Sequence, residues 1–170
     1  YHYVTGTDNL EYMAFEILVL PDLLLKINEM RAQEYDAVII GCFFDPVLDA
    51  AKELYDDMII VGVGESAILT ALKLGKTFSI IAARSKHFPK MLEGIERIGV
   101  KSRLASLRSL DIKVSQLQQD HNLLSRRMGE EISKAIEEDM AEVIVLGCTM
   151  ETGQYRSLQE THGIPVIDPT

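Results

Sequence analysis

The chain has 170 residues, of which 47% are hydrophobic, and this is enough apolar material to bury a core as one domain or as two closely joined lobes. Its formal net charge of −9 offers no positive surface to nucleic acid, and an acidic membrane would repel it. Two cysteines do not make a disulfide scaffold, and no apolar run reaches the roughly 18 residues of a spanning helix, so we expect a cytoplasmic protein with reduced thiols.

The first elements expected along the chain are helical. Thr7 or Asp8 can cap a helix that ends near Leu20. Pro21 suits the first turn of a following helix, whose apolar stripe continues to about Gln33.

A strand–helix–strand–helix pattern follows. Residues 36–42 predict a fully buried parallel strand, because the run is apolar, rich in β-branched residues and too short for a buried helix. Asp45 is a good N-cap and Pro46 a good first helical residue, which predicts a helix of about ten residues just after the strand. Residues 58–62 predict a second strand, and the helix after it is expected to end at Gly75 in a left-handed C-cap.

The second half repeats this alternation. Its expected elements are a strand over 77–83, a helix from Phe88 closed by Gly99, a short strand plus a loop within 100–118, a helix from Leu123 to Ile136, a strand over 142–148, a helix capped by Thr149 and ended by Gly163, and a last strand over 164–168. Strands that alternate with helices throughout indicate a parallel, doubly wound α/β architecture.

The chain contains an internal duplication with an offset of 106 residues. It relates the strand over 36–42 to that over 142–148, each opening on an acid and ending in Gly-Cys, and the strand over 58–62 to residues 164–168. We therefore expect two pseudo-symmetric parallel-sheet lobes, over residues 1–75 and 76–170, with an active site between them. Extending the duplication predicts one more strand before Tyr1 and one more helix after Thr170.

The paired cysteines, Cys42 and Cys148, are the candidate catalytic residues. Ligands of parallel sheets bind beyond the carboxyl ends of the strands, where both thiols lie, and a helix N-terminus beside each would lower its pKa. A substrate between them could lose a proton from carbon to one thiolate and gain a proton on the opposite face from the other thiol, which inverts the centre without a cofactor. N–H groups after each cysteine would stabilise the enolate oxygen.

Other interpretations of these residues are weaker. A lone Gly-Cys at a strand end is more often packing than catalysis, so a small-ligand-binding α/β domain with structural cysteines stays an alternative. A redox pair lacks the Cys-x-x-Cys spacing. The turn from Gly62 to Ser66 lacks the third glycine and the lysine of phosphate loops, and the four histidines show no metal-ligand spacing, so we expect no metal.

The segments that follow the strand ends provide the expected substrate contacts. Backbone N–H groups near Gly64 and the Ser66 hydroxyl are expected to hold the polar end of the substrate. The complete set of expected substrate-binding residues is Phe43, Phe44, Gly64, Glu65, Ser66, Thr149 and Met150. We expect a small-molecule substrate, no nucleic-acid or membrane partner, and a homo-oligomer.

Four motifs carry a family resemblance: Gly-Cys-Phe-Phe-Asp-Pro-Val-Leu-Asp-Ala-Ala over 41–51, Val-Gly-Val-Gly-Glu-Ser-Ala over 61–67, Val-Leu-Gly-Cys-Thr over 145–149 and Gly-Ile-Pro-Val-Ile-Asp over 163–168. Together they resemble the aspartate/glutamate/hydantoin racemase family, nearest its hydantoin and allantoin racemase branch. The resemblance implies two α/β lobes, an interface site and cofactor-independent racemisation by the two cysteines.

Three features of the chain depart from the family pattern. The usual first strand and its Asn-Pro-Asn-type loop have no counterpart here. Phe44 stands where hydantoin-type members usually have glycine, which would narrow a pocket, and Thr149 and Met150 stand where they have small residues. Hydantoins, allantoin and free amino acids therefore all stay open as substrates, and a related cysteine-dependent isomerase or decarboxylase is the alternative activity.

Overall fold

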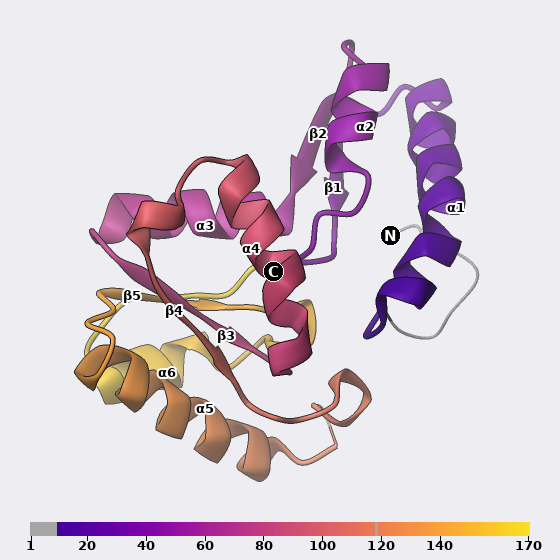
Figure 1. The fold of residues 1–170 in the computed structure, drawn as a ribbon. Helices are drawn as coiled ribbons and strands as arrows, with labels where there is room; N and C mark the ends of the chain where they lie inside the picture. The colour runs from indigo at the N-terminus through magenta and orange to yellow at the C-terminus, as the bar shows by residue number, and fades with distance from the viewer. Residues whose placement is uncertain (1–9, 118) are drawn as a thin grey trace.

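The computed structural model describes residues 10–117 and 119–170, which form two parallel sheets with helices packed on them (Figure 1). The helices are α1 (Met13–Ala32), α2 (Leu48–Leu54), α3 (Val63–Leu74), α4 (Phe88–Arg97), α5 (His121–Glu137) and α6 (Tyr155–His162), and the strands are β1 (Ala37–Ile40), β2 (Ile59–Gly62), β3 (Phe78–Ala82), β4 (Leu104–Ser109), β5 (Val143–Leu146) and β6 (Val166–Ile167). One sheet pairs β1 with β2, and the other has the order β4-β3-β5-β6. The predicted α/β class with two parallel sheets is confirmed.

The strand register reproduces the internal duplication. Val38 of β1 pairs with Ile60 of β2, and the residues 106 positions later, Ile144 of β5 and Val166 of β6, also pair. The same offset relates α1 to α5 and α2 to α6, since adding 106 to the residue numbers of the first helix of each pair nearly gives those of the second. Two copies of one α/β unit therefore carry the two cysteines at equivalent strand ends.

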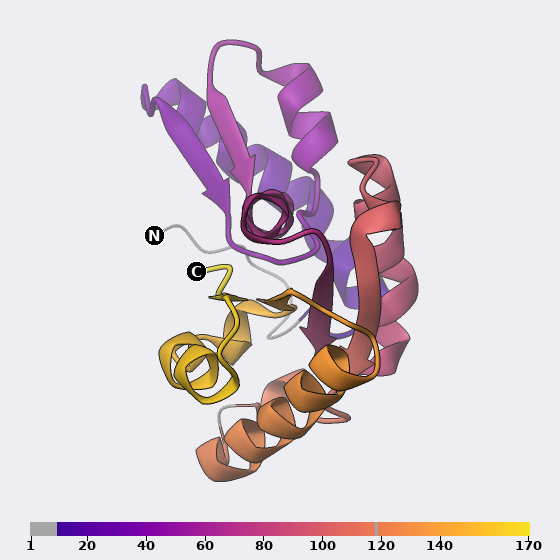
Figure 2. The same cartoon turned by 90° about the vertical axis from the view of Figure 1, so that its left-hand side faces the viewer.

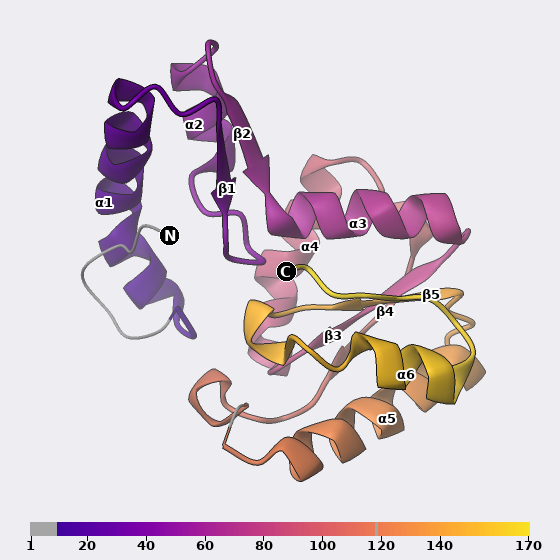
Figure 3. The same cartoon turned by 180° about the vertical axis from the view of Figure 1, so that it is seen from behind.

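The four-stranded sheet is covered on both faces (Figure 3). Every residue of β3 and β5 is buried, as expected for strands between two helical layers. Alternate side chains face opposite ways, because successive residues of a strand point to opposite sides. Toward α3 and α4 lie Phe78, Ile80, Val143 and Val145, and toward α5 and α6 lie Ile81, Ile144 and Leu146.

The two-stranded sheet is covered on one face only in the described part of the chain. Val38, Ile40 and Ile60 pack against α1 and α2. On the other face Ile39 is 69% exposed and Ile59 is 64% exposed. The prediction of a fully buried strand is therefore right for β5 and wrong for β1, because no described helix covers that second face. The strand before Tyr1 and the helix after Thr170 stay predictions.

The N-terminal helical region forms one helix instead of the expected two. Pro21 lies inside α1, and the buried side chains Val19 and Ile27 lie on either side of it. A proline within a helix removes one backbone hydrogen bond, and in this chain burial on both sides of Pro21 outweighs that loss. The expected caps Thr7 and Asp8 lie outside the described residues.

The glycines predicted as helix ends divide into two kinds. Gly99 and Gly163 are confirmed as the residues that end α4 and α6, and both have left-handed backbone, with φ of 74° and 70°. Gly75 has φ of −156°, so its predicted left-handed conformation is wrong. A Cβ at Gly75 would lie 2.7 Å from the Val143 side chain. This glycine is needed for close packing between α3 and β5, and an extended backbone leads directly from it into β3.

Helix α3 joins the two sheets. It follows β2 of the first sheet, yet Ala67, Ile68 and Ala71 pack in one cluster with Phe78 and Ile80 of the second. Figure 2 shows α3 end-on between the two sheets. The lobe boundary after residue 75 stays a prediction, since the packing of α3 lies with the second sheet.

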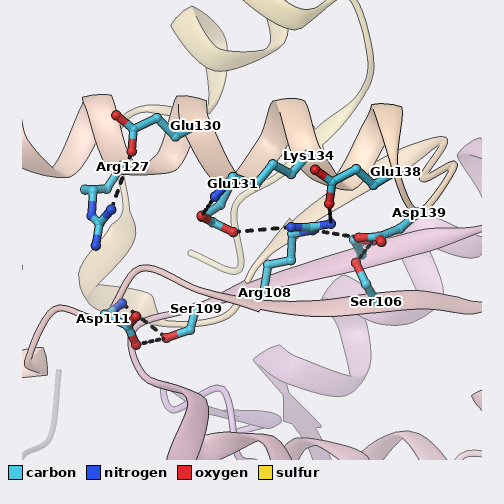
Figure 4. Close-up of polar contacts among 11 residues, drawn as sticks. Ser106, Arg108, Ser109, Asp111, Arg127, Glu130, Glu131, Lys134, Glu138 and Asp139 are labelled. Carbon is cyan, nitrogen blue, oxygen red and sulfur yellow. Dashed lines mark hydrogen bonds and ion pairs between the residues drawn. The ribbon is translucent and has the colours of Figure 1, made fainter.

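A cluster of charged side chains ties β4 to the C-terminal end of α5 (Figure 4). The Arg108 guanidinium lies 2.6 Å from Asp139, 2.6 Å from Glu138 and 3.6 Å from Glu131. Only 16% of the Arg108 side chain is exposed, and Asp139 and Glu138 raise its pKa. Removing the cation would leave three acids close together in a partly desolvated place.

We therefore expect Arg108→Met to lower the free energy of unfolding by about 2 kcal/mol. The matched control is Arg127→Met, which removes an exposed pair with Glu130 at 3.5 Å and should cost less than about 0.5 kcal/mol. Urea denaturation of both variants measures the difference. Equal losses would show that the Arg108 cluster contributes no more than a surface ion pair.

Candidate active site

The two thiols follow β1 and β5 at equivalent places. Cys42 and Cys148 each come two residues after the strand, and both are free and partly exposed. A thiolate at Cys42 would raise the pKa of Cys148, which indicates that the two thiols lie near enough to interact. Both lie at the carboxyl ends of parallel strands, where α/β proteins bind ligands.

Each thiol is also approached by one backbone donor from its own turn. The N–H of Phe44 points to Cys42, and the N–H of Met150 points to Cys148. Both donors belong to the second residue after the cysteine, so the duplication extends to the immediate surroundings of the sulfur atoms. These N–H groups favour the thiolate form.

Burial dominates the acidity of both thiols. It raises the pKa of Cys42 to about 11 and that of Cys148 to about 12, against the opposing effect of the backbone donors. The predicted lowering of both pKa values is therefore wrong. Neither thiol lies at an α-helix N-terminus, because α2 begins only at Leu48 and a short 3-10 turn, Thr149–Glu151, follows Cys148. The expected helix cap at Thr149 does not form.

Asp45 caps α3 rather than α2. Its carboxylate accepts hydrogen bonds from the N–H groups of Gly64 at 2.9 Å and Glu65 at 2.6 Å, and Arg97 lies 4.0 Å away. The N-cap of α2 is Val47, and both Asp45 and Val47 have positive φ, which turns the Asp45 side chain away from α2. The helix that follows Cys42 consequently has seven residues instead of about ten.

The expected donors near Gly64 already have partners within the protein. The N–H groups of Gly64 and Glu65 donate to Asp45, and the Ser66 hydroxyl donates to the Gly62 carbonyl at 2.7 Å. The Glu65 carboxylate pairs with Lys52 at 3.2 Å. These residues hold the turn between β2 and α3 in place.

Ser66 nevertheless lines a pocket between the two halves. The pocket has a volume of about 470 Å³ and is also lined by Val63, Asp168 and Thr170. Residues at the ends of β2 and β6 therefore share one opening, as their equivalent positions in the duplication predict.

The other expected substrate contacts differ in their exposure. Phe43 is buried in the core against α3, whereas Phe44 is partly exposed and lines two smaller pockets of about 260 and 220 Å³. After the second cysteine, Thr149 is partly exposed and Met150 is 38% exposed. Phe44, Thr149 and Met150 can thus meet a ligand, and Phe43 acts as a packing residue.

An ion pair next to Cys42 could not be predicted from the sequence. Glu16 of α1 and Lys90 of α4 lie 2.9 Å apart, and both line the two pockets next to Phe44. Lys90 lowers the pKa of Cys42 and Glu16 raises it. The two side chains come from helices of different lobes, so only the tertiary structure brings them together.

Glu151 is the second residue that sequence reasoning missed. Its carboxyl is completely buried in the turn after Cys148, and neither oxygen has a hydrogen-bond partner among the described residues. Burial raises its pKa well above the ordinary value, and the N–H groups of Gly147 and Cys148 oppose this without completing a hydrogen bond. The duplication relates Glu151 to Asp45, and this equivalence is the feature of the sequence that could have identified Glu151 as a site residue.

Two further findings concern the part of the chain that the structure describes. No three His, Cys, Asp or Glu side chains are grouped so that they could hold a metal ion. Within residues 10–117 and 119–170, no helix has both the length and the apolar character needed to cross a membrane.

The family follows from comparison with known sequences. The Asp/Glu/Hydantoin racemase family model matches residues 1–170. The chain belongs to this family. It is 33% identical over 160 residues to the hydantoin racemase of Rhizobium meliloti, covering 94% of this chain and 66% of that protein. It is 38% identical over 139 residues to the hydantoin racemase of Paenarthrobacter aurescens, covering 82% and 58%.

Solved structures of the family share the fold. The allantoin racemase of Klebsiella pneumoniae superposes with a TM-score of 0.90 at 28% identity, over 97% of this chain and 67% of that one. The predicted placement in the hydantoin and allantoin branch is confirmed. As a family member, the chain spans between 58% and 66% of the length of these two curated hydantoin racemases.

Proposed function

We propose that the protein is a racemase that inverts the α-carbon of a hydantoin-like or amino-acid-type substrate, with Cys42 and Cys148 as the two bases. The observation that carries the proposal is the equivalent placement of two neighbouring thiols at the ends of β1 and β5, in a chain of the racemase family. A planar carbanion between the lobes would have one thiol on each face.

In this reaction one thiolate removes the α-proton and the opposite thiol delivers its own proton to the other face. The reaction is balanced without a cofactor, because one proton leaves the carbon and one arrives. The pKa of each thiol is raised by burial, so each thiolate is a stronger base once formed. The N–H groups of Phe44 and Met150 would stabilise the thiolates as they form.

A cyclic ureide is the substrate class that fits best. Its α-carbon is more acidic than that of a free amino-acid carboxylate, which matters because each unit of pKa mismatch with the thiol costs about 1.4 kcal/mol. Two relatives that are 33% and 38% identical to this chain are named hydantoin racemases. The exposed side chains Phe44, Thr149 and Met150 are the contacts that would distinguish ring substituents.

The test is a side-by-side racemisation assay of 5-substituted hydantoins, allantoin, aspartate and glutamate, followed by circular dichroism or chiral chromatography. We expect turnover of at least one ureide and slower or no turnover of the two amino acids. Turnover of aspartate and glutamate alone would contradict the ureide assignment. Binding of a ureide without any inversion would favour a ligand-binding domain, and loss of carbon dioxide from a malonate would favour a decarboxylase.

A further inference from the structure

The two halves of the site differ at the third residue after each cysteine. Asp45 holds this position after Cys42, and Glu151 holds it after Cys148. Both side chains are buried, with 4% and 0% of their surface exposed. The charge state of each acid therefore depends on the partners that the fold provides.

Burial raises the pKa of Asp45, and the partners around its carboxylate oppose that effect. Two N–H groups at the start of α3 donate to its carboxylate, and the cation of Arg97 lies 4.0 Å away. These partners compensate one negative charge near Cys42. Glu16 and Asp45 raise the pKa of Cys42, and Lys90 lowers it.

Glu151 is compensated less well. The N–H groups of Gly147 and Cys148 favour its carboxylate, but neither oxygen completes a hydrogen bond among the described residues, and the nearby Asp168 carboxylate repels a negative charge on it. Asp168 itself is held by Thr152, by the N–H of Gly153 and by Thr170. A negative charge in this corner is therefore costly, and burial raises the pKa of Glu151 above that of an exposed carboxyl.

Glu151 and Cys148 share that corner. Glu151 is the charged group that acts most strongly on Cys148, and Cys42 adds a smaller effect of the same sign. Two negative charges so close together in a desolvated place oppose each other, so the corner accepts one charge far more easily than two. A carboxyl is by nature a stronger acid than a thiol, so the first charge forms on Glu151.

We propose that Glu151 makes the two thiols unequal by taking the one negative charge that its corner can hold, which keeps Cys148 protonated as the acid of the pair and leaves Cys42 as the base. Glu151 is thus a positioning residue that acts through Cys148. This inference rests on the two-thiol function proposed above and adds a direction to it. The substrate enantiomer whose α-proton faces Cys42 would react with the resting enzyme.

The test is the pH dependence of alkylation by iodoacetamide, measured separately for each cysteine by peptide mass spectrometry in the two-cysteine protein. We expect Cys42 to react at lower pH than Cys148. Glu151→Gln should move the midpoint for Cys148 down by about one pH unit or more and leave that for Cys42 unchanged. The matched control is Glu160→Gln, an exposed acid on α6, which should move neither midpoint.

The opposite results would overturn the inference. They are an unchanged midpoint for Cys148 in Glu151→Gln, an equal shift of both cysteines, or a wild-type protein in which Cys148 reacts first. Alkylation needs no substrate, so absence of racemase activity with a normal alkylation shift would remove the proposed function alone. Racemisation together with an unshifted midpoint would remove the Glu151 inference alone.

Glu151→Met keeps the proposal testable if the glutamine variant does not fold, because an apolar side chain suits a site without hydrogen-bond partners. It also gives a second measurement. The folded-state pKa of Glu151 lies above its ordinary value of 4.5. The contribution of Glu151 to the free energy of unfolding is therefore fully present below pH 4.5 and is lost as the pH rises through the folded-state pKa. Wild type should lose stability relative to Glu151→Met across this range. A constant difference would mean that the folded protein does not raise the pKa of Glu151, so the corner would accept negative charge without cost, which contradicts the premise of the inference.

Discussion

Replacing either Cys42 or Cys148 by serine is expected to slow racemisation by about 10²- to 10⁴-fold, because a hydroxyl is a far weaker acid and base than a thiol at neutral pH. Both positions should be affected, since each thiol works on one face of the substrate. Chiral chromatography of a 5-substituted hydantoin measures the loss. Far-ultraviolet circular dichroism of each variant would show that the fold is kept.

Solvent deuterium exchange separates the two thiols further. Each single variant keeps one thiol that can act as a base, so it should still exchange the α-proton of one enantiomer, and the two variants should exchange opposite enantiomers. Exchange should be slower in Cys42→Ser, because Glu151 disfavours the thiolate of Cys148. Full racemisation in both variants would exclude the two-base mechanism. Exchange of the same enantiomer by both would show that the thiols do not lie on opposite faces.

Gly64→Ala is expected to lower the free energy of unfolding by about 3 kcal/mol or more. A Cβ at this position would lie 2.0 Å from the Phe43 carbonyl oxygen and 3.1 Å from the Asp45 carboxylate. The turn that carries Cys42 packs directly on the backbone of α3 at this point, so backbone would have to move, and overpacking of this kind costs several kcal/mol. The cap that Asp45 makes on α3 would be displaced as well.

Gly94→Ala is the matched control, and its effect should have the opposite sign. Gly94 lies inside α4, and nothing lies within 4 Å of a Cβ built there. Alanine in an open helical position should raise the free energy of unfolding by about 1 kcal/mol. Urea denaturation measures both variants. A Gly64→Ala protein as stable as wild type would contradict the close contact between the Cys42 turn and α3.

The elements that could be predicted from sequence are those with local causes. The short apolar runs that became β1 and β5 were recognised by their length and composition, and the duplication related their cysteines. Gly99 and Gly163 were recognised as helix ends because a left-handed residue favours glycine. In each case the residues that determine the structure lie within a few positions of one another.

The features that could not be predicted depend on partners far apart in sequence. Asp45 has the local signature of an N-cap, but its hydrogen bonds go to α3, 19 and 20 residues later. The predicted acidity of Cys42 is wrong because burial raises its pKa and no α-helix begins beside it. Glu151 occupies the position equivalent to Asp45, but its carboxyl lacks the hydrogen bonds that Asp45 accepts, and only the tertiary structure shows that difference.

The crossing of α3 from one sheet to the other has a consequence for how the protein unfolds. Unfolding of the first sheet would displace α3, which packs on the second sheet. The Asp45 carboxylate also binds the first turn of α3 to the turn that carries Cys42. Ion pairs between Glu16 and Lys90 and between Asp49 and Arg97 add further ties across the same boundary. We therefore expect the two halves to unfold together as one cooperative unit, because the contacts that join them also fix the positions of the turns that carry the two thiols.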